Sequence, residues 1–162
     1  MRRAVTKVPA LVLLAALFAS CALKTVKTET FGDPASRRAV LLAYDYSDFK
    51  ADVAGRVMKD LTGDGYRVRV TDVSHLSGES AEPYGAVVLM APLVVWQLDK
   101  NVRDFIEKSP DKARIILVTT AGGPDWKADI KGVDAVTEAS VLSDAEALAH
   151  TVTGKVRALF EP

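Results

Sequence analysis

Three short, uninterrupted apolar runs constrain the fold of this chain more than any other feature. They cover residues 39–43, 86–90 and 115–118 and consist mostly of Val, Ile, Leu and Ala. Apolar runs of this length are typical of strands that are buried on both faces, as in a parallel sheet covered by helices. The sequence therefore predicts an α/β protein with three central strands.

Two further segments predict strands of a more polar kind. Residues 66–70 alternate apolar with charged side chains, and residues 135–141 include Thr137, Glu138 and Ser140. Such patterns are typical of half-exposed strands at the edges of a sheet. In a doubly wound sheet of order 2-1-3-4-5, the second and fifth strands are the edge strands. We therefore expect a three-layer, doubly wound parallel sheet of five strands in this order.

Apolar residues at helical spacing predict three helices. Ser47 or Asp48 is expected to cap the first helix, and Ser143 with Glu146 has the spacing of a capping box for the third. The connection before the third strand is short, and residues 121–134 are rich in Gly, Pro and Asp, so we expect two crossover helices to be missing. The predicted stripes are Phe49, Val53, Val57 and Leu61; Leu98, Val102, Phe105 and Ile106; and Leu148, Val152, Val156 and Leu159.

The first 20 residues have the pattern of a secretory signal peptide. Arg2, Arg3 and Lys7 are followed by an apolar stretch over residues 8–18 that is interrupted only by Pro. A membrane-spanning helix needs about 20 apolar residues, so this stretch is short for a transmembrane anchor, which is the alternative. We expect residues 1–20 to direct export.

Cys21, the only cysteine, directly follows Phe18-Ala19-Ser20. Small residues before a cysteine at this place resemble the lipobox of bacterial lipoproteins. The resemblance implies lipidation of Cys21 and a membrane-anchored lipoprotein of the cell envelope, with the lipid bilayer as its partner. The alternative is an incidental cysteine beside an ordinary cleavage site.

The remaining chain divides into a lipid-anchored tether at residues 21–36 and one domain at residues 37–162. The tether is expected to be extended because it contains Gly, Pro, Thr and Lys and lacks an apolar period. Removal of the signal leaves 18 basic and 21 acidic groups, a net charge of −3. This balance argues against a nucleic-acid surface.

The three loops after the first, third and fourth predicted strands resemble those of flavodoxins. They are Tyr44-Asp45-Tyr46-Ser47, residues 91–96 and residues 119–123. The resemblance implies a flavodoxin-like fold with FMN as a cofactor, whose phosphate lies in the first loop and whose ring lies between Trp96 and Trp126. The alternative is that these Trp side chains pack over the end of the sheet. The implied cofactor-binding residues are Tyr46, Ser47, Asp48, Lys50, Pro92, Leu93, Trp96, Thr120, Gly122, Gly123 and Trp126.

The chemistry of the first loop differs from that of a flavodoxin phosphate loop. Such loops close on the phosphate with hydroxyls and backbone N–H groups, whereas this one has no Gly, a single Ser, and the carboxylates Asp45 and Asp48. Two like charges about 4 Å apart repel by roughly 4 kcal/mol at an effective dielectric constant near 20. Lys50 either offsets one of the acids or is a solvated helix residue.

No catalytic motif is evident, so the protein is at most a flavin-dependent electron carrier. His75 and His150 have no metal-ligand spacing, and no metal site is expected. A phosphoacceptor receiver domain would need Asp where this chain has Ala91-Pro92. Two functions stay open: FMN-dependent electron transfer at a membrane, or a flavin-free interaction or small-ligand-binding module of the envelope.

Overall fold

The protein forms one mixed sheet flanked by helices. The computed structural model describes residues 24–94, 97–121, 130–139 and 141–161. The sheet has the order β1-β3-β2-β4-β6-β7, and β5 pairs with β4. The strands are β1 (Glu29–Phe31), β2 (Ala39–Tyr44), β3 (Arg67–Thr71), β4 (Ala86–Val94), β5 (Gln97–Leu98), β6 (Ile115–Ala121) and β7 (Asp134–Ala139).

The five predicted strands are β2, β3, β4, β6 and β7, and they are parallel in the predicted order. The helices are α1 (Asp48–Gly63), α2 (Lys100–Lys108) and α3 (Ala145–Ala158), with the 3₁₀ helices η2 (Val73–Gly78), η3 (Lys112–Arg114) and η4 (Leu142–Asp144). The doubly wound α/β prediction is confirmed.

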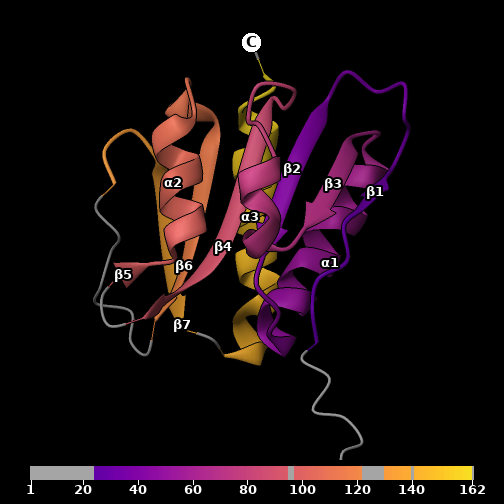
Figure 1. Ribbon diagram of the computed structural model, residues 1–162. Helices are drawn as coiled ribbons and strands as arrows, with labels where there is room; N and C mark the ends of the chain where they lie inside the picture. Colours follow the sequence, from indigo (N-terminus) through magenta and orange to yellow (C-terminus); the bar gives the residue numbers. More distant parts are fainter. Residues whose placement is uncertain (1–23, 95–96, 122–129, 140, 162) are drawn as a thin grey trace, which may run out of the picture.

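The sheet is the middle of three layers (Figure 1). Helices α1 and α3 cover one face, and α2 and η2 cover the other. Along β2, Val40 and Leu42 pack toward α1 and α3, whereas Leu41 and Ala43 pack toward α2 and η2. All four are fully buried, which explains why this strand is apolar at every position.

The first helix is capped as expected, and the third is not. The Ser47 side-chain oxygen accepts a hydrogen bond from the Lys50 N–H, and Gly65, just beyond α1, has a φ of 79°. The capping box predicted for α3 is wrong. Its Ser143 hydroxyl donates to Asp144, and Glu146 accepts from Arg56 of α1 at 3.3 Å, because that charged partner is within reach.

One of the two expected missing helices can be checked. The connection of residues 72–85 between β3 and β4 contains only the six-residue 3₁₀ helix η2. Most of the other crossover, residues 122–129, lies outside the described residues. Leu98, expected in the second helix, lies instead in β5 just before α2.

The prediction that residues 21–36 form a free, extended tether is wrong for the part of this segment that the structure describes. From Lys24 onward it is described, and β1 pairs antiparallel with β3 over Glu29–Phe31. Val26 is only 5% exposed and belongs to the core on the α1 side. As a result β3 is an interior strand, not the predicted edge. An open strand edge offers unpaired backbone groups, and β1 satisfies them.

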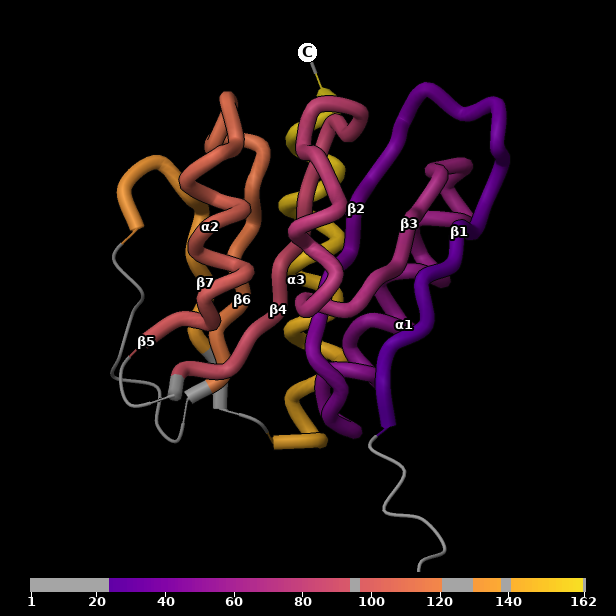
Figure 2. Tube along the Cα trace, viewed as in Figure 1, coloured from indigo at the N-terminus to yellow at the C-terminus, as the bar shows by residue number. Residues whose placement is uncertain are grey.

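The two ends of the described chain lie at opposite ends of the domain (Figure 2). The N-terminal segment enters where β2 and β4 end, and the C-terminus leaves at the other end. Residues 1–23, with the predicted signal peptide and Cys21, are outside the described residues. Within the described part, no helix is both long and apolar enough to cross a membrane.

Candidate functional site

The site predicted from the fold is the edge of the sheet where the parallel strands end, which we call the carboxyl edge. The chain leaves β2 toward α1 on one face and leaves β4 toward α2 on the other. Ligands of open α/β sheets bind at such a reversal of direction. The register aligns Tyr44 with Met90, and Pro92 with Thr120, so the ends of β2, β4 and β6 meet at this edge.

Only part of the predicted site can be placed. Pro92, Leu93 and Thr120 lie at the ends of β4 and β6. Tyr46, Ser47, Asp48 and Lys50 form the turn into α1. The four residues expected around a flavin ring, Trp96, Gly122, Gly123 and Trp126, lie outside the described residues.

Lys50 is neither a solvated helix residue nor a free cation. It is only 3% exposed, and its Nζ contacts Asp45 Oδ1. The Asp45 side chain is 34% exposed, so this carboxylate still reaches water on one side. The ammonium group of Lys50 is therefore already paired with the carboxylate of Asp45 in the same loop.

The second acid of the loop is also paired within the protein. The Tyr46 hydroxyl donates to Asp48 Oδ1 at 2.8 Å. Lys24 Nζ donates to the Tyr46 hydroxyl at 3.2 Å and lies 3.6 Å from Asp48 Oδ1. The hydrogen bond from Tyr46 and the charge of Lys24 lower the pKa of Asp48, and the bond to Tyr46 raises the pKa of Lys24.

These contacts do not fit a flavin phosphate. The two strongest donors in the loop, the Lys50 ammonium and the Tyr46 hydroxyl, are already bonded to Asp45 and Asp48. The Ser47 oxygen is engaged as the cap of α1. The charges of Lys24 and Lys50 are balanced by those of Asp45 and Asp48. A phosphate dianion would therefore find no excess positive charge here, and to bind it would have to displace the hydrogen bonds within the loop.

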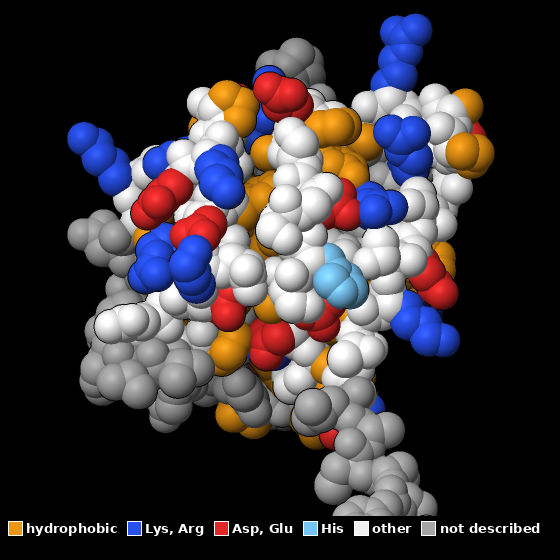
Figure 3. Space-filling model, in the orientation of Figure 1, with side chains coloured by type: hydrophobic (Ala, Val, Ile, Leu, Met, Phe, Trp, Pro, Cys, Tyr) orange, Lys and Arg blue, Asp and Glu red, His pale blue; other side chains and the backbone are white. Residues whose placement is uncertain are grey.

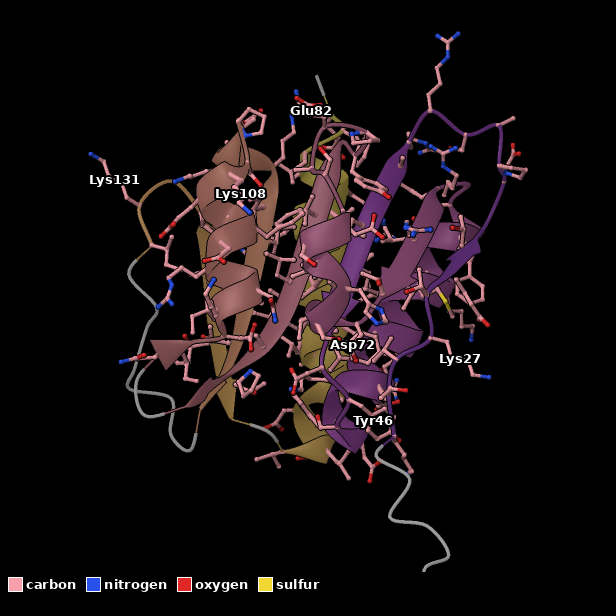
Figure 4. The ribbon with its side chains drawn as sticks, in the orientation of Figure 1. Lys27, Tyr46, Asp72, Glu82, Lys108 and Lys131 are labelled. Carbon is pink, nitrogen blue, oxygen red and sulfur yellow. The ribbon has the colours of Figure 1, made fainter. Side chains whose placement is uncertain are left out.

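A strap, residues 24–31, crosses the domain next to this loop. Its Val26 N–H donates to Asp72 Oδ2 at 3.3 Å, and the Thr28 and Thr71 hydroxyls are 2.8 Å apart. Figure 4 shows Tyr46, Asp72 and Lys27 toward one end of the domain, with Glu82 at the other. The sequence offered little sign of the strap, because β1 has three residues and pairs mainly through its backbone.

Beneath the strap is a cavity of about 230 Å³, on the α1 side of the sheet. This is below the range of about 300–1,000 Å³ that is usual for ligand pockets. Tyr44 is half-buried in its wall, and burial raises the pKa of its hydroxyl. Its lining includes Val26, Phe31, Tyr44, Tyr46, Gly55 and Met58.

Asp72 connects the strap to η2. Burial by itself would raise the pKa of Asp72, but hydrogen bonds from the Ser74 N–H, the Ser74 hydroxyl and the Val26 N–H together lower it. A carboxyl whose pKa is lowered on folding stabilises the fold above its unfolded pKa, near 3.8. This stabilisation is lost as the pH falls through the lower folded value.

We expect Asp72→Ala to loosen the strap. Amide hydrogen exchange of residues 24–31 should rise about tenfold at neutral pH, the effect of losing one buried charged acceptor worth roughly 1.5 kcal/mol. Asp111→Ala is the control, because Asp111 likewise caps a 3₁₀ helix by accepting the Ala113 N–H, but that helix is η3. Equal protection of the strap in Asp72→Ala and wild type would contradict this role.

The face that carries α2 and η2 shows no large basic patch. Acidic and basic side chains are interspersed over its upper part, and several acidic side chains lie near one another lower down (Figure 3). Neighbouring opposite charges include Lys100 with Asp104, and Arg69 with Glu79 at 2.7 Å. On this face, the charges do not form the continuous basic surface that nucleic acids require.

Comparison with solved structures identifies the fold. A flavodoxin from the domain Archaea matches with a TM-score of 0.54 and 8% identity, covering 76% of this chain and 99% of that one. Flavodoxin 2 from Bacillus cereus matches with a TM-score of 0.51 and 12% identity, covering 74% and 98%. A flavo di-iron protein mutant from Thermotoga maritima matches with a TM-score of 0.56 and 13% identity over 76% of this chain and 36% of that one.

A scan against protein-family models finds no match, and a search of curated proteins finds none that is significant. The chain contains a flavodoxin-like domain, as the sheet order and the matched structures show. Its loop after β2 differs from a phosphate-binding loop in that Asp45 is paired with Lys50 and Asp48 with Lys24 of the strap.

Proposed function

We propose that the protein is a lipid-anchored module of the cell envelope that uses the flavodoxin scaffold without an FMN phosphate site. In this role it binds a protein partner or a small ligand. The observation that carries the proposal is the internal pairing of Lys50 with Asp45 and of Tyr46 with Asp48. The pattern of residues 1–21 supports the anchor, with Cys21 as the lipidated residue.

A second function, FMN-dependent electron transfer, is favoured by the match to flavodoxins over about three quarters of the chain. Bound FMN would supply reversible one- and two-electron redox chemistry. Trp96 and Trp126 would hold the ring by resemblance, while Pro92 and Thr120 hold the adjacent strand ends in register. The loop at Tyr46 would contribute little to holding the phosphate.

Titration with FMN and with riboflavin separates the two functions. The two flavins share the ring and differ in the phosphate, so a working phosphate site makes FMN bind much more tightly. We expect FMN to bind no more than threefold tighter than riboflavin, measured by quenching of flavin fluorescence. If neither FMN nor riboflavin binds at high micromolar concentration, that result also supports the absence of a phosphate site.

An FMN affinity at least tenfold above that of riboflavin would contradict the proposal and establish the electron carrier. Equal, measurable affinities would indicate a site that holds only the ring. Heat-treated protein at the same concentration is the control for nonspecific quenching.

A further inference from the structure

Two large hydrophobic side chains are exposed next to each other at the start of η4. Val141 is 47% exposed and Leu142 is 61% exposed, and they are the most exposed large hydrophobic residues in the part of the chain that the structure describes. Isolated exposed hydrophobic residues are common, so the position of this pair matters more than its existence.

The pair lies at the same end of the domain as the strap. Helix η4 leads into α3, whose first turn is at the end where β2 and β4 finish (Figures 1 and 2). Hydrophobic side chains also reach the surface along this lower edge in the space-filling view (Figure 3). The carboxyl edge thus combines an apolar turn with the entry point of the N-terminal segment.

The strap fixes how far this edge can lie from the predicted anchor. Lys24 is held by Tyr46 and Asp48, and Val26 is buried in the core. Only two residues, Ala22 and Leu23, separate Cys21 from Lys24, and the three steps from one Cα atom to the next span at most about 11 Å. A lipid on Cys21 would therefore hold the domain close to the membrane at this end, because the free spacer is much shorter than the tether expected from sequence.

We propose that the carboxyl edge is a bilayer-contacting surface, with Val141 and Leu142 inserted among the lipid headgroups. The inference rests on the proposed lipid anchor and adds an orientation to it. Short anchoring at the strap brings the edge to the membrane, and the apolar pair then makes that orientation more favourable than others because its exposed surface leaves water. The opposite end, with Glu82, faces away from the membrane.

The orientation can be measured with fluorophores at the two ends of the domain. Single cysteines are introduced in the full chain as Ser143→Cys, next to the apolar pair, and as Glu82→Cys, an exposed residue at the opposite end. The only native cysteine is Cys21, and lipidation would block its thiol. The lipidated proteins are reconstituted into phosphatidylcholine vesicles that contain spin-labelled headgroups, which quench nearby fluorophores.

We expect at least twofold stronger quenching at residue 143 than at residue 82. Changing Val141 and Leu142 together to Ser should reduce this ratio, whereas Leu159→Ser, an exposed apolar residue following α3, should leave it unchanged. Ten Gly and Ser residues inserted before Lys24 should also reduce the ratio.

Different results would overturn the lipid anchor and the orientation of the domain. Protein that does not float with vesicles, and behaves like Cys21→Ser, would overturn the anchor and with it the orientation. Protein that floats but is quenched equally at residues 82 and 143 would overturn the orientation alone.

Discussion

Asp45→Asn is expected to lower the free energy of unfolding by about 2–3 kcal/mol, because it removes the charged partner of a buried ammonium group. Lys50 is 3% exposed and contacts Asp45. Loss of one member of a buried ion pair costs about 3–5 kcal/mol, and we place this case lower because Asp45 is partly open to water. Urea denaturation at neutral pH measures the change.

Lys50→Met should cost less, under about 1 kcal/mol, because a methionine fills the buried space and Asp45 can turn to water. Asp104→Asn, which breaks the exposed pair with Lys100, should leave the midpoint of urea unfolding almost unchanged and is the surface control. If Lys50→Met proved more damaging than Asp45→Asn, the Lys50 charge would have a role that this pairing does not explain.

Gly32→Ala is expected to cost about 3 kcal/mol. Gly32 follows β1 with a φ of 85°, a conformation that costs other residues about 1–2 kcal/mol. A Cβ atom there would also overlap the backbone carbonyl oxygen of Tyr66, which cannot move away as a flexible side chain could. Overpacking of this kind adds about 1–3 kcal/mol. The midpoint of urea unfolding should fall accordingly.

Gly55→Ala is the matched control within the same domain. Gly55 lies inside α1, and a Cβ atom there has open space around it. Alanine favours a helix interior over glycine by about 0.5–1 kcal/mol, so this variant should be more stable than wild type. A similar loss in Gly32→Ala and Gly55→Ala would indicate that the backbone at Gly32 is not the cause.

The central strands were predictable because both of their faces are buried. Along β2 and β4 every inward position on either face needs an apolar side chain, so the apolar run itself marks the strand. Strand β1 carries no such mark. Its pairing with β3 is made by backbone groups that every residue has, and its three residues are too few for a period.

The site was predictable only in its local parts. Ser47 was correctly expected to cap α1, since a cap depends on residues a few positions apart. The burial of Lys50 was not predicted, because it depends on Asp45 folding back over it. One signal was available: Lys50 lies four residues before Ala54, on the buried side of α1. Glu146 failed as a capping residue because Arg56 reaches it from another helix.

The strap also bears on how the protein can be shortened. A form that begins at residue 37, where the sequence alone suggested that the domain starts, would lack Val26 and all of β1. It would leave a gap in the core and present β3 as an open edge to other molecules in solution, which favours aggregation. A shortened form that keeps the chain from Lys24 onward should therefore stay folded and aggregate less than one that begins at residue 37.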